Sequence, residues 1–461
     1  SYSAGTAETL AFPCFGGECK WKYHYYYYPY YYTYTRLPFI YGSDNDTLSA
    51  FVDDSWQVTD NLTLNIGVRY DKNGGDIPSY PVLDNDMNPT GESFPAINNM
   101  IDWQTISPRI GLAYQVAKGK GVIRASYGKY YDGNVTGNWN DLAPGQSPAY
   151  YSWGYYYDGP FYVYDVWEPA NVALPEDLKP PETDQYALGY EHQFGSNMAV
   201  GIQAVHKKTK NLIGFEILGD GVYEMVDFAD PVTGEVYQLA SVIEEPTIRK
   251  GNRPGEGSLA PPGADYWQEY DGLFLTFNRR YSNGWSLQAS YGYSESKGRA
   301  PRMLAQSQGR VFWGVLEGSD PNHHINAEQL QQGDRRHIFQ AQGNFDLPWE
   351  LQSSVVFKYL DGRAHNRQTQ ALGLEQGRET VIMEPANDSL RLPERYMLDF
   401  TLGRAFPLGA GTEFRLDLQI FNILNETAWD SWDGDAYSRG QFVPTNWVLP
   451  RRVMLRFVFD W

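Results

Sequence analysis

The sequence predicts an all-β protein, an antiparallel transmembrane β-barrel, and three observations support this prediction. The last eleven residues, 451–461, alternate apolar and polar side chains and end on Trp461, although chain ends usually fray in water. Aromatic residues make up 16% of the chain, with 36 Tyr and 14 Trp, and membrane barrels need them for girdles at both interfaces. Short polar turns alternate with long connections, which predicts short periplasmic turns and long extracellular loops.

Composition narrows the class of protein further. No run of about 18 apolar residues occurs, so no helix is expected to span a bilayer. The strands of a membrane barrel alternate apolar residues, which face lipid, with polar residues, which face the lumen. A barrel can therefore cross the membrane without any long apolar run. The formal charge of −19 argues against nucleic acid as a partner, because its phosphates would be repelled. The chain starts at Ser1 without Met or a signal peptide, which indicates a mature, processed or partial chain.

Period-2 alternation predicts thirteen strands. The clearest is 62–70, in which every second residue from Leu62 to Tyr70 is apolar and would face lipid, while the residues between them would line the lumen. Short turns join the strands into six hairpins, and the terminal segment is the thirteenth strand. The predicted strands are residues 48–58, 62–70, 107–116, 122–131, 184–194, 198–207, 273–281, 285–295, 337–345, 351–360, 395–406, 413–422 and 451–461.

The direction of these strands bears on the first part of the chain. If the last strand runs into the periplasm, the strand at 48–58 runs the same way and needs an upward partner from earlier residues. Bacterial barrels of this kind have an even strand number. One upward strand within residues 20–40 gives 14 strands; otherwise further strands precede Ser1. We therefore expect an extracellular aromatic-rich segment at 1–46, which has room for one such strand, and a transmembrane barrel at 47–461.

Five segments resemble TonB-dependent outer-membrane receptors, most closely the Oar-like branch. They are TLSAFVDDSWQVTDNLTLNIGVRYD (47–71), ISPRIGLAY (106–114), IRASYGKYYD (123–132), DRRHIF (334–339) and LQIFNILN (418–425). The resemblance covers about residues 47–461. It implies a 22-stranded barrel with an N-terminal plug and a TonB box, of which this chain resembles the C-terminal 13 or 14 strands. No segment here is assignable as plug or TonB box.

The resemblance also implies partners. A bacterial outer-membrane location places the chain among outer-membrane lipid and lipopolysaccharide. The TonB system would supply energy if a plug exists. The barrel-assembly machinery would recognise the aromatic end of the last strand, so we expect Phe457, Phe459 and Trp461 to form the assembly signal.

Two tyrosine-rich segments are the strongest candidates for ligand capture. Residues 23–34 contain nine Tyr in twelve positions, and residues 150–167 are similarly aromatic. Such rings stack on a sugar, glycan or planar siderophore, and Tyr also offers a hydroxyl. The alternative is an interfacial girdle with self-packed loops. The candidate residues are Tyr25, Tyr27, Tyr30, Trp153, Tyr155, Tyr156, Tyr157 and Trp167.

Three smaller signals remain open. Asp84, Asp86, Asn88 and Glu92 space oxygen ligands in a way that suits Ca²⁺ in an extracellular loop. The sixth-position glycine of an EF-hand is missing, and a solvated acidic loop is the preferred interpretation. Cys14 and Cys19 are the only cysteines and form a candidate disulfide in an oxidising compartment. The adjacent residues His323 and His324 are interpreted as exposed residues on the surface of a loop.

No catalytic motif is present: the sequence lacks G-x-S-x-G, a P-loop, C-x-x-C and H-E-x-x-H. We therefore expect a receptor or transporter rather than an enzyme, with an unidentified substrate captured by aromatic and acidic extracellular loops. A structural or adhesive surface protein anchored by the barrel is the first alternative. A passive porin-like channel is the second. An upstream plug and TonB box in the complete reading frame would distinguish transport from the other two.

Overall fold

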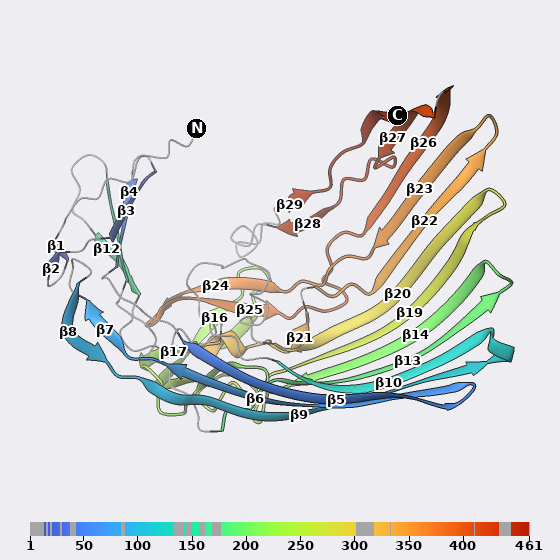
Figure 1. The fold of residues 1–461 in the computed structure, drawn as a ribbon. Coiled ribbons are helices and arrows are strands. Elements are labelled where there is room, and N and C mark those ends of the chain that lie inside the picture. Colours follow the sequence, from blue (N-terminus) through green and yellow to red (C-terminus); the bar gives the residue numbers. More distant parts are fainter. Residues whose placement is uncertain are drawn as a thin grey trace.

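One large antiparallel sheet dominates the computed structural model, and strands that follow one another along the chain are also neighbours in space (Figure 1). The path runs from β5 at one edge to β30 at the other. Its thirteen strands are β5 (Asp44–Thr59), β6 (Leu62–Ile77), β9 (Ile97–Val116), β10 (Gly121–Tyr131), β13 (Glu182–Phe194), β14 (Met198–Lys210), β19 (Trp267–Ser282), β20 (Trp285–Arg299), β22 (His337–Leu347), β23 (Leu351–Leu360), β26 (Arg395–Gly409), β27 (Thr412–Phe421) and β30 (Arg452–Asp460).

The short β21 (Gln329–Leu330) also pairs with β20, which makes the sheet 14-stranded. The residues that the structure describes are 13–14, 17–18, 21–27, 30–36, 43–83, 88–132, 142, 149–155, 162–167, 177–300, 318–331, 333–409, 411–432 and 444–460.

All thirteen strands predicted from alternation are present, and each predicted short turn connects its pair. The turn between β19 and β20 shows why: Ser282 lies opposite Trp285, so only Asn283 and Gly284 form the loop. Both adopt positive φ, 53° and 81°. An Asn-Gly pair tolerates this conformation, and its twist matches that of the flanking strands. None of the helices in the described part of the chain is long and apolar enough to cross a membrane.

The register aligns apolar residues into rows that cross the sheet on one face. Residues that pair directly on neighbouring strands share a face, so a row of such pairs forms a continuous surface. Many of these side chains are exposed in the isolated chain, as expected for a face that lies against lipid. One row, from β6 to β19, is Leu64, Leu112, Ala125, Leu188, Ala204 and Leu273.

Aromatic pairs border this apolar face at both ends of the strands. Near the long loops, the ring centroids of Tyr127 and Tyr186 lie 4.9 Å apart. Near the short turns, the Phe414 and Phe459 centroids lie 4.8 Å apart, and Phe414 lies directly opposite Phe459 in the register. Two aromatic borders enclosing an apolar band are the girdles of a membrane barrel.

The described parts of segment 20–40, residues 21–27 and 30–36, do not pair with β5. Instead β3 (Trp21–Tyr27) and β4 (Tyr30–Arg36) form a hairpin, and β4 pairs on its other side with β11 (Ala149–Tyr155), which pairs with β12 (Tyr162–Trp167). Only residues 28–29 separate β3 from β4, so local pairing satisfies their backbone groups without β5.

The remaining hairpins lie toward the long-loop end of the strands (Figure 1). They are two-stranded, and all except the first belong to the connections that the sequence predicts to be long. The pairs are β1 (Pro13–Cys14) with β2 (Gly17–Glu18), β7 (Tyr80–Leu83) with β8 (Pro89–Phe94), β15 (Gly214–Ile217) with β18 (Ile248–Gly251), β16 (Val222–Ala229) with β17 (Val236–Glu244), β24 (Arg367–Leu374) with β25 (Gly377–Glu384), and β28 (Trp429–Trp432) with β29 (Pro444–Trp447).

Strand β9 begins ten residues before its predicted start at Ser107. In its first half the hydrophobic phase is inverted: Ile101 and Trp103 are buried and share a face with Ser107, the lumen face. The lipid face there carries Asp102 and Gln104. Above the membrane the outside is water and the inside is the packed loops, so the apolar residues change sides.

Candidate functional site: the long-loop layer

The packed hydrophobic core lies in the long loops rather than in the wall of the sheet. Two clusters of buried residues occur in the described part of the chain. The first joins the β6–β9 connection to β15 through Ile77, Ile101, Trp103, Leu142 and Phe215. The second joins β17 to β24 and β25 through Leu239, Ala371, Leu374, Val381 and Met383. The connection between β14 and β19 contributes to both clusters, so we call the whole assembly the long-loop layer.

Buried amide side chains tie three loops of this layer together. Asn322, on the 3-10 helix η4 (Pro321–His324), is fully buried. Its Oδ1 accepts from the N–H of Ala240 at 2.8 Å, and its Nδ2 donates to the Ala240 carbonyl at 2.9 Å. Gln376 donates to the same carbonyl and to Asp320, and accepts from the N–H of Val242. The bonds to Ala240 and Val242 satisfy backbone groups that would otherwise be buried without a partner, and the bond to Asp320 joins two side chains.

A buried ion pair fastens the β16–β17 turn to β24. The guanidinium of Arg367 donates to both carboxylate oxygens of Asp230, at 2.7 and 2.5 Å, and the Asp230 side chain is fully buried. Burial alone would raise the pKa of Asp230. The bonds from Arg367, the Val232 N–H and the Thr233 hydroxyl outweigh burial and lower the pKa to about 2. The pair is therefore ionised at neutral pH.

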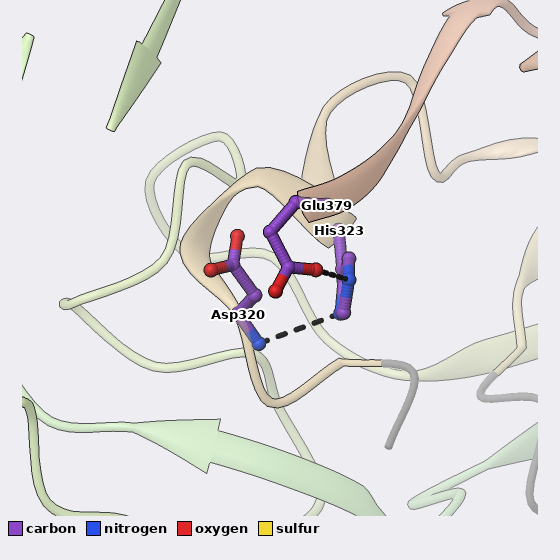
Figure 2. Close-up of side chains that lie close together, drawn as sticks. All are labelled: Asp320, His323 and Glu379. Atoms are coloured by element: carbon purple, nitrogen blue, oxygen red, sulfur yellow. Dashed lines mark hydrogen bonds and ion pairs between the residues drawn. The ribbon is translucent and has the colours of Figure 1, made fainter. Parts of the chain in front are cut away.

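Asp320, His323 and Glu379 bring three potential metal ligands together, with one ligand atom of each within 4.8 Å of the others (Figure 2). The imidazole Nε2 of His323 lies 2.8 Å from Glu379 Oε2, and Nδ1 accepts from the Gly318 N–H at 3.0 Å. Burial, and then the charge of Glu379, raise the pKa of Asp320.

The hydrogen bonds of His323 argue against a metal. A neutral imidazole carries one proton, and because Nδ1 accepts, that proton lies on Nε2 and is donated to Glu379. An ion on Nε2 would move the proton to Nδ1, against the Gly318 N–H. The cluster is thus a hydrogen-bonded joint between η4 and β25. The interpretation of His323 and His324 as loop surface is wrong, because His324 is buried and burial lowers its pKa to about 4.

The face of the sheet opposite lipid carries a charged cluster that sequence reasoning missed. Asp417 is almost fully buried and accepts from Arg415 at 2.8 Å and from Arg456 at 2.7 Å. A Cβ on Gly403 would lie 2.1 Å from Asp417 Oδ1, so glycine provides the necessary space. Only the register, which places Gly403 and Arg456 on either side of Asp417, reveals the cluster.

The structure brings the two tyrosine-rich segments into one sheet, β12-β11-β4-β3. Direct pairing forms three rows of positions: Tyr23, Tyr34 and Tyr151; Tyr25, Tyr32 and Trp153; and Tyr27, Tyr30 and Tyr155. Trp167 lies opposite Ala149, in the next alternate row. Six of the eight predicted capture positions therefore share one face of this sheet. Tyr156 and Tyr157 are outside the described residues.

The other predicted site residues are only partly described. Asn88 precedes β8 and Glu92 lies within it, whereas Asp84 and Asp86 are outside the described residues, so Ca²⁺ stays a prediction. Cys14 lies in β1, and Cys19 is not described, so the disulfide also stays a prediction. On β30, Phe457 and Phe459 occupy the lipid face and are 61% and 59% exposed; Trp461 is not described.

Comparison with known proteins now assigns this arrangement to a class. Residues 28–362 match the family model of the outer membrane beta barrel domain. The chain belongs to this family and is a bacterial outer-membrane β-barrel protein, whose long loops are extracellular. It is similar to the TonB-dependent transporter Oar of Myxococcus xanthus, with 25% identity over 416 residues, which are 85% of this chain and 36% of that protein.

Solved structures of outer-membrane receptors are also similar. The ferric yersiniabactin uptake receptor FyuA of Yersinia pestis has a TM-score of 0.47 and 10% identity, covering 98% of this chain and 49% of that one. The outer membrane transporter YddB of Escherichia coli has a TM-score of 0.47 and 13% identity, covering 93% of this chain and 55% of that one. The chain thus spans about a third of the curated relative's length and about half of these structures.

Proposed function

We propose that this chain forms part of the wall and the extracellular layer of a TonB-dependent receptor that captures and takes up a substrate at the cell surface. The observation that supports this most directly is the four-stranded sheet, which collects six predicted capture positions on one face. A contiguous aromatic surface outside the membrane usually marks a binding surface. The similarity to a TonB-dependent transporter supports uptake and the TonB system as partner.

The same rows suggest what the surface binds. Eight of the nine positions in the three rows are Tyr and the ninth is Trp, so these rows offer rings and hydroxyl groups. Charged positions on this face lie at its border, where Asp165 pairs with Tyr151 and Arg36 lies in the row of Trp167. Such a face suits a sugar, a glycan or a planar siderophore. A surface protein that uses the sheet for adhesion is the alternative, and it predicts binding without uptake. Recognition of Phe457, Phe459 and Trp461 by the barrel-assembly machinery also remains part of the proposal.

The register allows a sharp test of the capture surface. We expect Trp153→Ser with Tyr155→Ser to weaken ligand binding by about 1 to 3 kcal/mol, because two ring contacts are lost. Tyr26→Ser with Tyr31→Ser is the matched control, since these two residues pair with each other in the alternate row. Intact cells would be screened against a glycan array and a panel of ferric siderophores. Equal loss in both variants, with normal surface expression, would reject the aromatic face as the capture surface.

A further inference from the structure

The four-stranded sheet β12-β11-β4-β3 presents its aromatic rows as an extended platform. In Figure 1 its labelled strands lie apart from the wall of the large sheet. Positions on one face recur every two residues, about 6.8 Å along a strand, and neighbouring strands lie about 4.8 Å apart. The nine positions of the three rows therefore cover an area of about 14 by 10 Å, whose long direction follows the strands.

A platform of this shape selects the form of its ligand. A small ligand usually buries roughly 70–90% of its surface in a concave site, whereas the face of a sheet contacts only one side of a ligand. One stacked ring reaches one row, because the centroids of stacked rings lie about 4.5–7 Å apart. A ligand gains from the remaining rows only if it repeats along the strands, and its linked contacts then reinforce one another.

The chemistry of the rows indicates a repeating ligand without charge. None of the nine residues is acidic or basic, so none can pair with a charge on each unit of a polyelectrolyte. At the border, Asp165 and Arg36 carry opposite signs, and the protein as a whole carries −19, which repels polyanions. Aromatic rings suit the apolar faces of sugar rings, and Tyr hydroxyls suit sugar hydroxyls.

We propose that the ligand of this face is a neutral β-1,4-linked polysaccharide that lies along the strands, with its successive sugar rings stacked on successive rows. This inference rests on the proposed function and narrows the ligand to one class. Equatorial β-1,4 linkages keep the rings in a flat ribbon that matches the face of a sheet, whereas α-1,4 linkages curve the polymer. The row of Trp21 and Trp167 continues the face beyond the first of the three rows, so about three to four sugar units reach the end of the platform.

The length of the oligosaccharide provides the test, because a platform and a pocket respond to it differently. The purified full chain, confirmed as folded by its heat-modifiable mobility, would be titrated calorimetrically with cello-, xylo- and N-acetylated chito-oligosaccharides of two to six units. Malto-oligosaccharides are the α-1,4-linked control. We expect the affinity for at least one β-1,4 series to rise about 2- to 10-fold with each added unit, the effect of one ring contact, and to level off at about four units. An affinity that does not change with length, or equally tight binding of malto-oligosaccharides, would overturn the assignment.

Removal of one row tests where the polysaccharide lies. Tyr27→Ser with Tyr30→Ser removes a directly paired couple from the last row, so the affinity should level off about one unit earlier while that for the disaccharide stays the same. Tyr26→Ser with Tyr31→Ser changes the adjacent couple on the opposite face and should leave the length dependence intact. The same length dependence in both variants would overturn the placement along the strands.

A second class of ligand separates this inference from the proposed function. If a ferric siderophore bound and Trp153→Ser with Tyr155→Ser abolished its binding, while no β-1,4-linked oligosaccharide bound, the polysaccharide would be rejected and the aromatic face would remain the capture surface. If oligosaccharides bound with the expected length dependence but were unaffected by these two substitutions, the face itself would be rejected and both proposals would fall.

Discussion

Asp230→Asn should loosen the long-loop layer while leaving the barrel wall folded. The substitution keeps the shape of the side chain but removes the charge that makes both short contacts with the buried guanidinium of Arg367, whose ion pair with Glu384 is longer, at 3.6 Å. Loss of one partner of a buried pair costs about 3 to 5 kcal/mol. Hydrogen exchange should therefore accelerate in β16–β17 and β24–β25, the two hairpins that this pair joins, and remain unchanged in the strands of the wall.

Two controls make this result specific. Glu350→Gln removes one partner of the exposed pair with Arg404, which lie 3.0 Å apart, and should cost less than about 1 kcal/mol. Asp230→Leu combined with Arg367→Met should recover stability, because an apolar pair leaves no buried charge. If Asp230→Asn accelerated exchange no more than Glu350→Gln, the pair would not stabilise the layer.

The same pair predicts a pH dependence. The pKa of Asp230 is lowered to about 2 in the folded chain from the ordinary 3.8. A lowered carboxylate pKa means that the unfolded state binds the proton more readily, so the contribution of Asp230 to stability is complete above about pH 4. It is lost as the pH falls from there toward 2. Exchange in the two hairpins should accelerate over that acidic interval, and Asp230→Asn should abolish the dependence.

Ile202→Arg should destabilise the barrel strongly, while Gln203→Arg on the next position should not. Ile202 lies between Tyr190 and Leu275 on the lipid face, and Gln203 lies between Gly189 and Phe274 on the lumen face. A cationic side chain facing lipid near the bilayer midplane costs about 2 to 4 kcal/mol. A folding titration in lipid vesicles measures both variants. Greater sensitivity to Gln203→Arg would mean that the assigned faces are reversed, and equal sensitivity would mean that the two positions do not face lipid and lumen as assigned.

The strands of the barrel wall were predictable because the polarity of each residue depends on which face of the sheet it occupies. Lipid on one side and water on the other impose a period of two, which locates strands and faces from the sequence alone. The rule fails where the environment changes. In β9, Ile101 and Trp103 belong to a strand whose apolar side has moved inward, so alternation with the opposite phase concealed ten residues of strand.

The candidate site was less accessible to sequence reasoning. Composition identified the tyrosine-rich segments, but their pairing depends on contacts between residues more than a hundred positions apart, such as Tyr32 with Trp153. The pair of Asp230 with Arg367 is separated by 137 positions. No pattern of neighbouring residues in the sequence indicates either of these two contacts. The pairing of β4 with β11 rather than with β5 was not predictable for the same reason, because alternation does not specify which edge a strand will join.

Thiol labelling of intact cells tests the central claim most directly, because the claim fixes which end of the strands faces the outside. In a Cys14→Ser, Cys19→Ser background, a single cysteine at Asn283, in the short turn between β19 and β20, should be inaccessible to a membrane-impermeant maleimide. One at Glu92 in β8 should be labelled. Both should react once the cells are lysed. Labelling at Asn283 with protection at Glu92 would contradict an outer-membrane barrel whose long loops face the cell exterior.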